Sequence, residues 1–303
     1  MIGVTLRQLE YFLAAAETGT VTAAARRCSA SQAAVSTGLS ELERGLRLQL
    51  LVRRTAKGVT LTRSGELVLA IARRILDDVT ELEVLAETEL DEVAGPLRVG
   101  CTHALSPRVL PALAQAFRQQ HPLVDLDLFD GLAADVQAML LRGEIDACLV
   151  YRRQLERDLD ARTLRTIVPY AVLAADHPLA RRDGVSLREL ADEPLIQVNP
   201  EGSHGVIELL VEEAHVRPRH GWTFSNPETV RSMVARNLGY SVFSGKPASA
   251  ETFDGGRVAY VRVTDSIAHN DVVLATPHGT RPTARLQALV RLLGSEELQA
   301  SFG

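Results

Sequence analysis

One long amphipathic segment constrains this chain more than any other feature of its 303 residues. Between residues 63 and 93 the apolar positions recur mostly every third or fourth residue, and charged side chains cover the other faces. These positions are Val68, Ile71, Ile75, Val79, Leu82, Leu85 and Leu90. A single long helix of this kind has no core of its own, so its apolar stripe needs a partner. We expect a coiled-coil seam with a second copy of the chain; the alternative is a helix that lies on its own domain.

The residues before this helix show capping residues and short stretches of helical periodicity. We expect helices over residues 6–16, 21–28 and 32–45, with Gly19 ending the first and Thr20 capping the second. Residues 48–54 and 59–61 have the pattern of two strands joined by a turn. Three short helices followed by a hairpin indicate a winged helix-turn-helix over residues 1–62, which is a DNA-binding arrangement.

Charge divides the chain at the same place. Residues 1–62 carry eight basic and four acidic side chains, whereas residues 63–92 carry three basic and nine acidic ones. The whole chain has a net charge of −5, which argues against a protein that coats nucleic acid without sequence preference. A small basic module ahead of an acidic helix indicates that only the N-terminal end meets a polyanion.

Composition excludes several other classes of protein. A hydrophobic fraction of 46% is that of a globular chain and not of a disordered one. The longest apolar run, at residues 167–175, contains Pro169 and is too short to span a bilayer. Glu10 stands where a signal peptide needs an apolar core, and the three cysteines are scattered. We therefore expect a cytoplasmic protein without disulfides.

After Gly95-Pro96, where we expect the long helix to end, strands and helices alternate. Strands are predicted at residues 97–101, 124–129, 145–151, 194–198, 221–224, 240–243 and 271–276, and helices at 106–120, 132–142, 205–214, 227–237 and 282–293. This alternation predicts a mostly parallel sheet in each of two α/β lobes. We expect lobe I near residues 97–165 and 265–303 and lobe II near 166–264, with crossovers near 162–173 and 258–263.

Candidate DNA-contacting residues follow from the helix-turn-helix. The second helix of such a pair lies in the major groove and presents its first turns to the bases, while a wing contacts the DNA backbone. Glutamine can bind adenine with two hydrogen bonds, and serine or threonine can contact bases or phosphates. The predicted contacts are Ser31, Gln32, Ala33, Ser36 and Thr37 on the helix, and Arg53, Arg54 and Lys57 on the wing. The alternative is a solvated basic surface.

Known catalytic and metal-binding motifs are absent from the sequence. It has no dinucleotide fingerprint, phosphate-binding loop, nucleophile elbow or HExxH motif. Cys101 and His103, with two distant histidines, are weak candidates for a metal site because such residues more often serve packing. We expect no catalytic residues, no metal and no cofactor.

Short motifs follow one another in a fixed order along nearly the whole chain. The N-terminal ones are LRQLEYF at 6–12, AAARR at 23–27, SQAAVS at 31–36 and GVTLT at 58–62. The second half contains LRVG at 97–100, HP at 121–122, GEID at 143–146 and DHPL at 176–179. In this ordered combination the sequence resembles the LysR-type transcriptional regulators. Gly38 inside the recognition helix departs from helix propensity, and the run 239–247 departs from the family's apolar pattern.

The resemblance implies an α/β protein with an N-terminal winged helix-turn-helix at 1–62 and a long dimerising linker helix at 63–94. It also implies a two-lobed, periplasmic-binding-protein-like effector domain at 95–303. A regulator of this type binds double-stranded promoter or operator DNA, responds to a small molecule held between the lobes, and assembles as a homotetramer from dimers.

Candidate effector-binding residues follow from the predicted sheets. In open α/β sheets, ligands bind beyond the carboxyl ends of the strands, beside helix N-termini that favour anions. The candidates are Thr102, His103, Ser106 and Tyr151 from lobe I, and Gln197, Asn199, Ser203 and His204 from lobe II. Ser225 and Asn226 lie at a further strand end but also suit helix caps. Hydroxyls, amides and histidines predict a small, polar or carboxylated ligand.

Two other classes of function stay open at this point. One is an enzyme with a DNA-binding appendage, against which the missing catalytic motifs argue. The other is an architectural DNA-binding protein, which the acidic net charge and the large α/β half disfavour.

Overall fold

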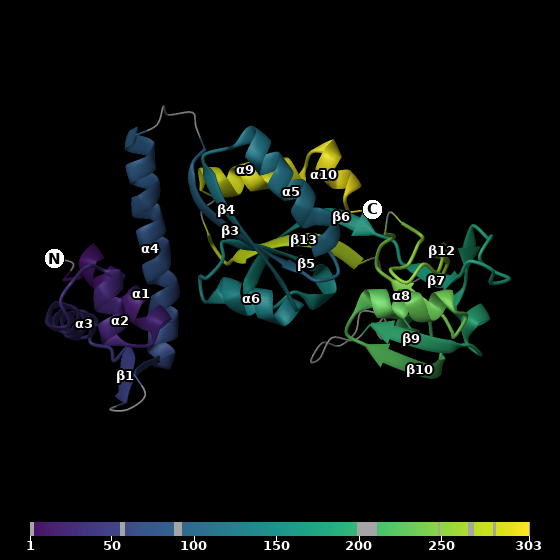
Figure 1. Cartoon of the computed structure of the whole chain (residues 1–303), viewed down its shortest axis with the longest axis horizontal. Helices are drawn as coiled ribbons and strands as arrows, with labels where there is room; N and C mark the ends of the chain where they lie inside the picture. The colour runs from purple at the N-terminus through teal and green to yellow at the C-terminus, as the bar shows by residue number, and fades with distance from the viewer. Residues whose placement is uncertain are drawn as a thin grey trace.

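The computed structural model places three bodies in a row: a helical N-terminal domain, an α/β lobe in the middle and a second α/β lobe at the far end (Figure 1). It describes residues 3–54, 58–87, 93–198, 211–247, 249–265, 270–280 and 283–302. The chain passes through the middle lobe twice, so its C-terminus lies beside the junction of the two lobes (Figure 1).

The N-terminal domain is the predicted winged helix-turn-helix. Its elements are α1 (Leu6–Thr18), α2 (Val21–Arg27), α3 (Gln32–Leu46), β1 (Leu51–Arg54) and β2 (Gly58–Leu61). The side chains of Thr5, Thr20 and Ser31 cap the three helices in turn, and Gly19 ends α1 in the left-handed conformation. β1 and β2 pair antiparallel as the wing. The predicted elements are present here, with ends shifted by up to three residues.

Two glycines in this domain are explained by close packing. A Cβ on Gly38 of α3 would lie 2.7 Å from the ring of Tyr11 in α1, so the glycine lets the two helices approach each other. Gly58 has a φ of +80°, and a Cβ there would collide with the carbonyl oxygen of Gly19. The helix-weakening Gly38 is therefore a packing residue, which helix propensity alone does not reveal.

The long helix α4 (Arg63–Glu87) presents three different faces. Leu69 and Ala72 are buried in the core of the N-terminal domain. Ala70, Arg73 and Asp77 face the middle lobe, where Asp77 pairs with Arg98 at 3.2 Å. The third face exposes a row of apolar side chains: Leu67 is 67% exposed, Ile71 50%, Ile75 37% and Leu82 68%.

The alternative of a helix that lies on its own domain holds for one face of α4, and a second face contacts lobe I. The coiled-coil seam stays a prediction for the third face, which carries the exposed apolar row. Val68, which the sequence placed in the seam, packs against the N-terminal core instead. Residues 88–92, including Leu90, lie outside the described residues, and Gly95-Pro96 begins a strand instead of ending a helix.

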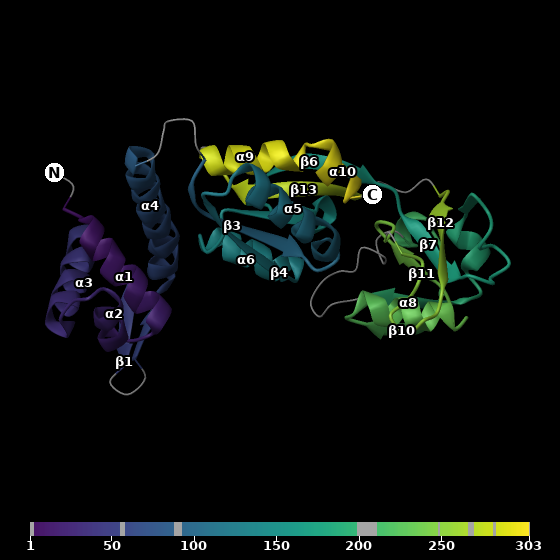
Figure 2. The same ribbon diagram turned by 45° about the horizontal axis from the view of Figure 1, so that its top comes forward.

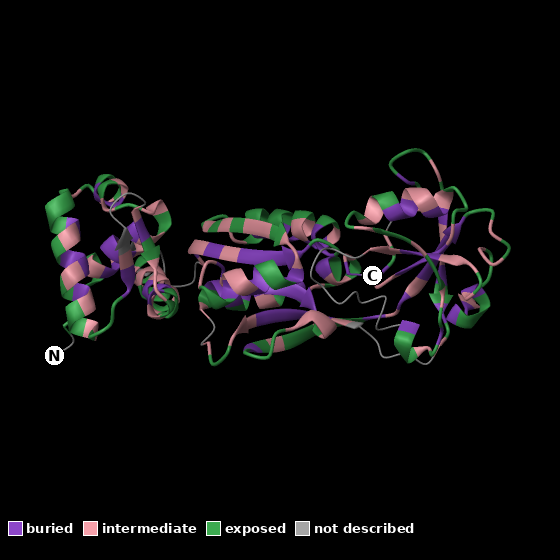
Figure 3. Ribbon diagram, turned by 90° about the horizontal axis from the view of Figure 1, so that it is seen from below, coloured by how far each residue is buried: buried purple, intermediate pink, exposed green. Residues whose placement is uncertain are grey.

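Lobe I is built on a five-stranded sheet in the order β4-β3-β5-β13-β6. Its elements are β3 (Gly95–Thr102), α5 (Ser106–Gln120), β4 (Val124–Gly131), α6 (Ala133–Leu141), β5 (Ala147–Tyr151), η1 (Arg152–Gln154), β6 (Leu159–Ile167), β13 (Asn270–Pro277), α9 (Ala284–Leu293) and α10 (Glu296–Ala300). Helices α5, α9 and α10 cover one face and α6 covers the other (Figure 2). The central strands are buried from both sides (Figure 3).

Lobe II repeats this layering around a smaller sheet. It contains β7 (Tyr170–Ala174), β8 (Gly184–Val185), η2 (Leu187–Leu190), β9 (Pro194–Val198), β10 (Arg219–Phe224), α8 (Pro227–Ala235), β11 (Ser241–Phe243) and β12 (Val258–Val263). The sheet order is β11-β7-β12-β8, and a bridge between Leu195 and Tyr240 joins the β9–β10 pair to it. The predicted helix at 205–214 is described only from residue 211 onwards.

Two expectations about this region were wrong. The sheets are mixed and not mostly parallel, because β13 runs antiparallel to both β5 and β6, and β7 runs antiparallel to β11 and β12. Residues 258–263 are not a crossover: they form β12, which pairs inside lobe II. The returning chain crosses after β12 and runs beside the first crossover, where the Val263 amide donates to the Pro169 carbonyl at 3.1 Å.

Candidate DNA-binding surface and interlobe cavity

The first turns of α3 form an exposed surface of short polar and apolar side chains. Gln32, Ala33 and Thr37 are exposed, while Ser36 is half-buried. The hydroxyl oxygen of Ser31 accepts the Ala34 amide at 3.1 Å as the helix cap, which leaves its own O–H to donate outwards. Gln32 and Ser36 are four residues apart and share one side of the helix.

This surface is held in place by the core behind it. Val35, Leu39 and Leu42 of α3 are buried against α1 and α2, so the opposite side of the helix must face outwards. Glu43 near the end of α3 accepts the amides of Leu50 and Leu51 at 2.8 and 3.1 Å, which fixes the start of the wing. Recognition helix and wing are thus one rigid unit.

The wing residues are described only in part. Arg53 and Arg54 lie on β1, opposite Val59 and Gly58 of β2. Lys57 lies outside the described residues. The backbone places Arg53 and Arg54 at the end of the hairpin farthest from the start of α4, where Thr62 caps that helix through the Gly65 amide at 2.9 Å.

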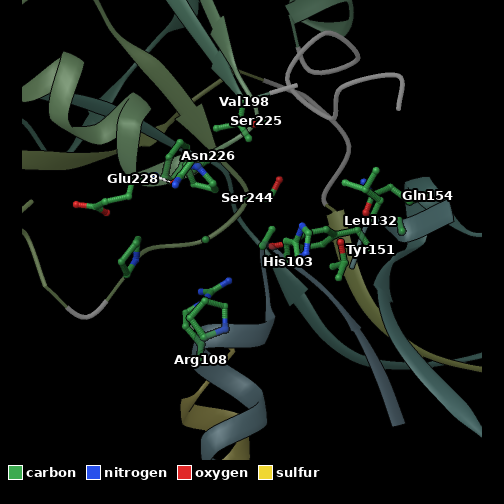
Figure 4. A pocket seen from close by; sticks show the side chains of 18 of the residues that line it. His103, Arg108, Leu132, Tyr151, Gln154, Val198, Ser225, Asn226, Glu228 and Ser244 are labelled. Atoms are coloured by element: carbon green, nitrogen blue, oxygen red, sulfur yellow. Dashed lines mark hydrogen bonds between the residues drawn. The ribbon is translucent and has the colours of Figure 1, made fainter. Parts of the chain in front are cut away.

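A cavity of about 400 Å³ lies between the two lobes (Figure 4). Lobe I contributes the carboxyl ends of β3 and β5 and the first turns of α5 and α6. Lobe II contributes the end of β9, the start of α8 and the loop that follows β11. These are the strand ends and helix N-termini at which the sequence analysis expected a ligand.

Three of the predicted residues of lobe I line this cavity, and so do Ser225 and Asn226 of lobe II, of which Asn226 also caps α8. Thr102 and Tyr151 are almost fully buried at the strand ends, and His103 is exposed to the space between the lobes. The imidazole Nε2 of His103 lies 3.7 Å from the Asp130 carboxylate. Burial raises the pKa of the Tyr151 phenol, although the neighbouring Arg108 guanidinium acts in the opposite direction. The phenol is therefore a proton donor at neutral pH.

Two predicted residues do not line the cavity. The hydroxyl of Ser106 is 3.3 Å from the Asp130 carboxylate and 3.4 Å from the His103 carbonyl, so it holds the loop from behind. Gln197 alternates with Ile196 and Val198 along β9 and faces the other side of the sheet. Asn199, Ser203 and His204 lie outside the described residues.

The sequence analysis missed a cationic group that lines the cavity, Arg108. Arg108 lies in the first turn of α5 and faces lobe II (Figure 4). Its Nη1 donates to the Phe302 carbonyl at 3.3 Å, and a Cβ on Gly245 of lobe II would lie 2.7 Å from the same nitrogen. The sequence feature that points to Arg108 is its position in the first turn of a helix that starts at the carboxyl edge of the sheet.

Several features give the lobe I side of the cavity a positive potential. The N-terminus of α6 has no side-chain cap, which leaves backbone amides of its first turn available. In α5, Pro107 has no N–H and the amides of Arg108 and Val109 donate to the Leu105 carbonyl, so this helix contributes its dipole and Arg108. Both helix dipoles direct their positive ends towards the same space. Among the described residues no carboxylate forms an ion pair with Arg108. These groups together favour an anion.

The lobe II side is neutral in charge and partly apolar. Arg231 and Glu228 of α8 form an ion pair at 2.5 Å, and Arg231 also donates to the carbonyls of Ser249 and Glu251. Val198, Val242 and Phe243 complete this wall. The cavity is therefore more apolar than the predicted residues suggested.

Metal and cysteine chemistry have little support in the described part of the chain. No three histidine, cysteine or acidic side chains in it are arranged to hold a metal ion. Cys101 and Cys148 are buried on the central strands; burial raises the pKa of Cys148 to about 12 and that of Cys101 still further. Cys28 is half-buried in the N-terminal domain. No described helix is long and apolar enough to cross a membrane.

Comparisons with known proteins agree along the whole chain. The family model "Bacterial regulatory helix-turn-helix protein, lysR family" matches residues 6–66, and "LysR substrate binding domain" matches residues 90–297. The HTH-type transcriptional regulator YnfL of Escherichia coli (strain K12) is 30% identical over 94% of this chain and 96% of its own length.

Two solved structures are similar over almost the full length. HinK, a LysR family transcriptional regulator from Pseudomonas aeruginosa, is 29% identical with a TM-score of 0.63, covering 97% of this chain and 98% of its own. A full-length OxyR variant from the same organism is 25% identical with a TM-score of 0.74, covering 99% of this chain and 97% of its own.

The burial of two cysteines gives a first prediction. Iodoacetamide at about pH 8 alkylates thiolates, so it should modify the half-buried Cys28 slowly in the folded protein, because burial raises the pKa of this thiol too. It should leave Cys101 and Cys148 unmodified until urea is added. Peptide mass spectrometry after a timed reaction measures this. Alkylation of Cys148 in the folded protein at the rate of Cys28 would contradict the buried position of β5.

Proposed function

This chain belongs to the LysR family of transcriptional regulators, and from that premise we propose that an anionic small molecule in its interlobe cavity controls how it binds DNA. The chain is a DNA-binding regulator and not an enzyme. The observation that carries the proposal is Arg108: a guanidinium that faces the cavity, with two helix N-termini beside it.

The proposed effector is a carboxylate with an apolar body. Its carboxylate would lie at Arg108, with Thr102 and Tyr151 as further hydrogen-bond donors. Its apolar part would lie against Val198, Val242 and the neighbouring wall of lobe II. A second negative charge on the ligand is disfavoured there because Glu228 already neutralises Arg231. His103, at the cavity edge, would contact a polar substituent.

For DNA we propose a division of labour between helix and wing. Gln32, Ser36 and Thr37 would contact base edges in the major groove, with Ala33 lying against the groove floor and Ser31 on a phosphate. Arg53, Arg54 and Lys57 would contact phosphates beside the groove. The exposed side of α3 supports the first assignment, and the position of β1 in the hairpin supports the second.

The exposed row on α4 supports a dimer. Leu67, Ile71, Ile75 and Leu82 are all exposed apolar side chains on the helix. We assign this row to a seam with α4 of a second chain, because exposed apolar rows on a long helix gain most by pairing. Two such dimers would form the homotetramer that is typical of the family. The protein would bind its DNA in the cytoplasm.

The base-reading assignment predicts a sequence-dependent loss for Gln32→Ala. The operator duplex is first selected from a random pool by the wild-type protein. On this duplex the variant should lose about 1–3 kcal/mol of binding free energy, and on a scrambled duplex its binding should change little. Arg53→Ala should weaken binding to both duplexes. It should also make the negative slope of log affinity against log salt less steep, by about 0.9 for each lost phosphate contact. Fluorescence anisotropy over a salt series measures both. An equal loss on both duplexes for Gln32→Ala would remove α3 from base reading.

The cavity assignment predicts that Arg108→Gln loses ligand binding while DNA binding is retained. A screen of aliphatic and aromatic monocarboxylates by thermal shift should find a ligand that raises the melting temperature of the wild type. Because Arg108→Gln removes the charged hydrogen bonds, the affinity for that ligand should fall by about 10- to 100-fold. Arg118→Gln, an exposed arginine at the other end of α5, is the control and should bind as the wild type does. Equal affinities for both variants would place the anion elsewhere.

The seam predicts that the double variant Ile71→Glu, Leu82→Glu is a monomer. Two carboxylates in each helix would face their copies across the seam. Burying unpaired charge is more unfavourable than the remaining apolar contacts are favourable, so the dimer should dissociate. Thr80→Glu, which introduces the same charge at an exposed position off the row, should keep the wild-type mass. Light scattering distinguishes these outcomes, and a full-size oligomer for the double variant would exclude this row as the interface.

A further inference from the structure

Helix α6 connects the two functional ends of lobe I. At its start, Leu132, Ala133 and Ala134 line the interlobe cavity. At its end, the turn at Arg142 and Gly143 lies against α4. A helix of nine residues spans about 14 Å, so this short rod covers the whole distance from the cavity to the linker helix. Val136 and Leu140 pack its inner side onto the sheet.

The contact at the α4 end leaves no free space. Gly143 has a φ of +66°, and a Cβ there would lie 2.8 Å from the Cα of Ala70 and 3.0 Å from its carbonyl oxygen. At residue 143 the backbone of the turn therefore lies directly against the backbone of α4, with no room for a side chain. Any shift of this turn along its contact direction must move α4 or break the contact.

Arg73 extends this contact to the DNA-binding domain. Its side chain is only 12% exposed and lies between three partners. Nη2 pairs with Glu17 of α1 at 2.9 Å, and Nη1 donates to the Arg142 carbonyl at 3.3 Å. The Glu144 carboxylate lies 3.9 Å from the same Nη1. One guanidinium thus joins the winged helix-turn-helix, the linker helix and the end of α6.

The cavity end of α6 is bonded to the short helix η1. Gln137 is 1% exposed, and its Nε2 donates to the Ala133 carbonyl and to the Gln154 carbonyl, each at 2.8 Å. Its Oε1 accepts the Glu156 amide at 2.8 Å. A buried amide with all of these bonds made is costly to disrupt, so α6 and η1 move together.

The helix η1 in turn holds lobe II. Arg153 is 14% exposed in its side chain, and its Nη2 pairs with both oxygens of Glu213 in lobe II, at 2.8 and 2.9 Å. This pair joins the two lobes on the side where Gln154 lines the cavity. The described contacts therefore run without a gap from lobe II through η1, α6 and α4 to α1.

We propose that α6 transmits the separation of the lobes to the DNA-binding domain through Arg153 at one end and Arg73 at the other. The proposal rests on the proposed function, because a ligand in the cavity is what would change the separation. A ligand that bridges Arg108 and lobe II alters the position of Glu213 relative to η1, and Gln137 passes this to α6. The turn at Gly143 then shifts α4, and Glu17 moves with Arg73.

The test needs neither ligand nor DNA. Hydrogen exchange of the full chain is compared between the wild type and two variants that break the lobe II end, Arg153→Ala and Glu213→Gln. A partly exposed ion pair of this kind stabilises weakly, so exchange at residues 70–77 of α4 and 14–18 of α1 should become about two- to fivefold faster. Two variants from opposite sides of one pair keep the test valid if either folds poorly.

Two controls separate transmission from general loosening. Arg165→Ala breaks a hydrogen bond to the Gln299 carbonyl inside lobe I, on the side of the sheet away from α6, and Arg182→Ala breaks a pair with Glu189 inside lobe II. Both should leave residues 70–77 unchanged. If Arg153→Ala and Glu213→Gln accelerate exchange only around 150–156 and 211–216, the proposal is overturned, while thermal shifts with carboxylates would still report on the cavity by themselves.

A glycine pair tests the other end of the rod. Gly143→Ala should displace the turn from Ala70 and raise exchange at residues 70–77 without touching the cavity. Gly279→Ala imposes the same left-handed strain, at φ +70°, in open space and is the matched control. In the Gly143→Ala background, Arg153→Ala should add no further effect at 70–77. Full additivity of the two changes would show that they act through separate routes and would also overturn the proposal.

Discussion

The parallel pairing of β3 with β4 and β5 organises everything else in lobe I. Because these strands point the same way, each connecting helix must start at the carboxyl edge of the sheet and end at the amino edge. The carboxyl edge then collects strand ends and helix N-termini, which make the cavity. The amino edge collects helix ends and the start of β3, which meet the linker helix. Ligand site and linker contact are opposite edges of one sheet, and α6 runs between them.

The linker helix α4 makes different contacts on each of its three faces. Leu69 completes the core of the DNA-binding domain, and Ala70 and Arg73 fasten that domain to lobe I. The third face exposes its apolar row, which the proposed seam would cover. A dimer seam and an intramolecular contact can coexist because they use different sides of the helix. A change in lobe I can thereby reach the DNA-binding domain without passing through the seam.

The cavity has a polar and an apolar side, and this asymmetry comes from the two lobes. Lobe I supplies Arg108, Tyr151 and the helix N-termini, whereas lobe II supplies Val198, Val242 and an already neutralised ion pair. A ligand with a charged end and an apolar end must touch both lobes to satisfy both. Such a ligand would fix the distance between the lobes, which the Arg153–Glu213 pair also spans.

The sequence by itself determined the local features: the capped helices of the N-terminal domain, the long linker helix, most strands, and Thr102, His103 and Tyr151 at strand ends. Caps, periodicity and strand ends are set by neighbouring residues, and family motifs add the two-lobed plan. Only the tertiary structure decided the antiparallel return of β13, the packing role of Gly38, the exclusion of Gln197 from the cavity and the place of Arg108 in its lining. It also decided that Arg73 and Glu17 meet. These depend on contacts between residues far apart in the chain, which no local pattern records, because the cost of bringing them together is met by burial in the whole fold.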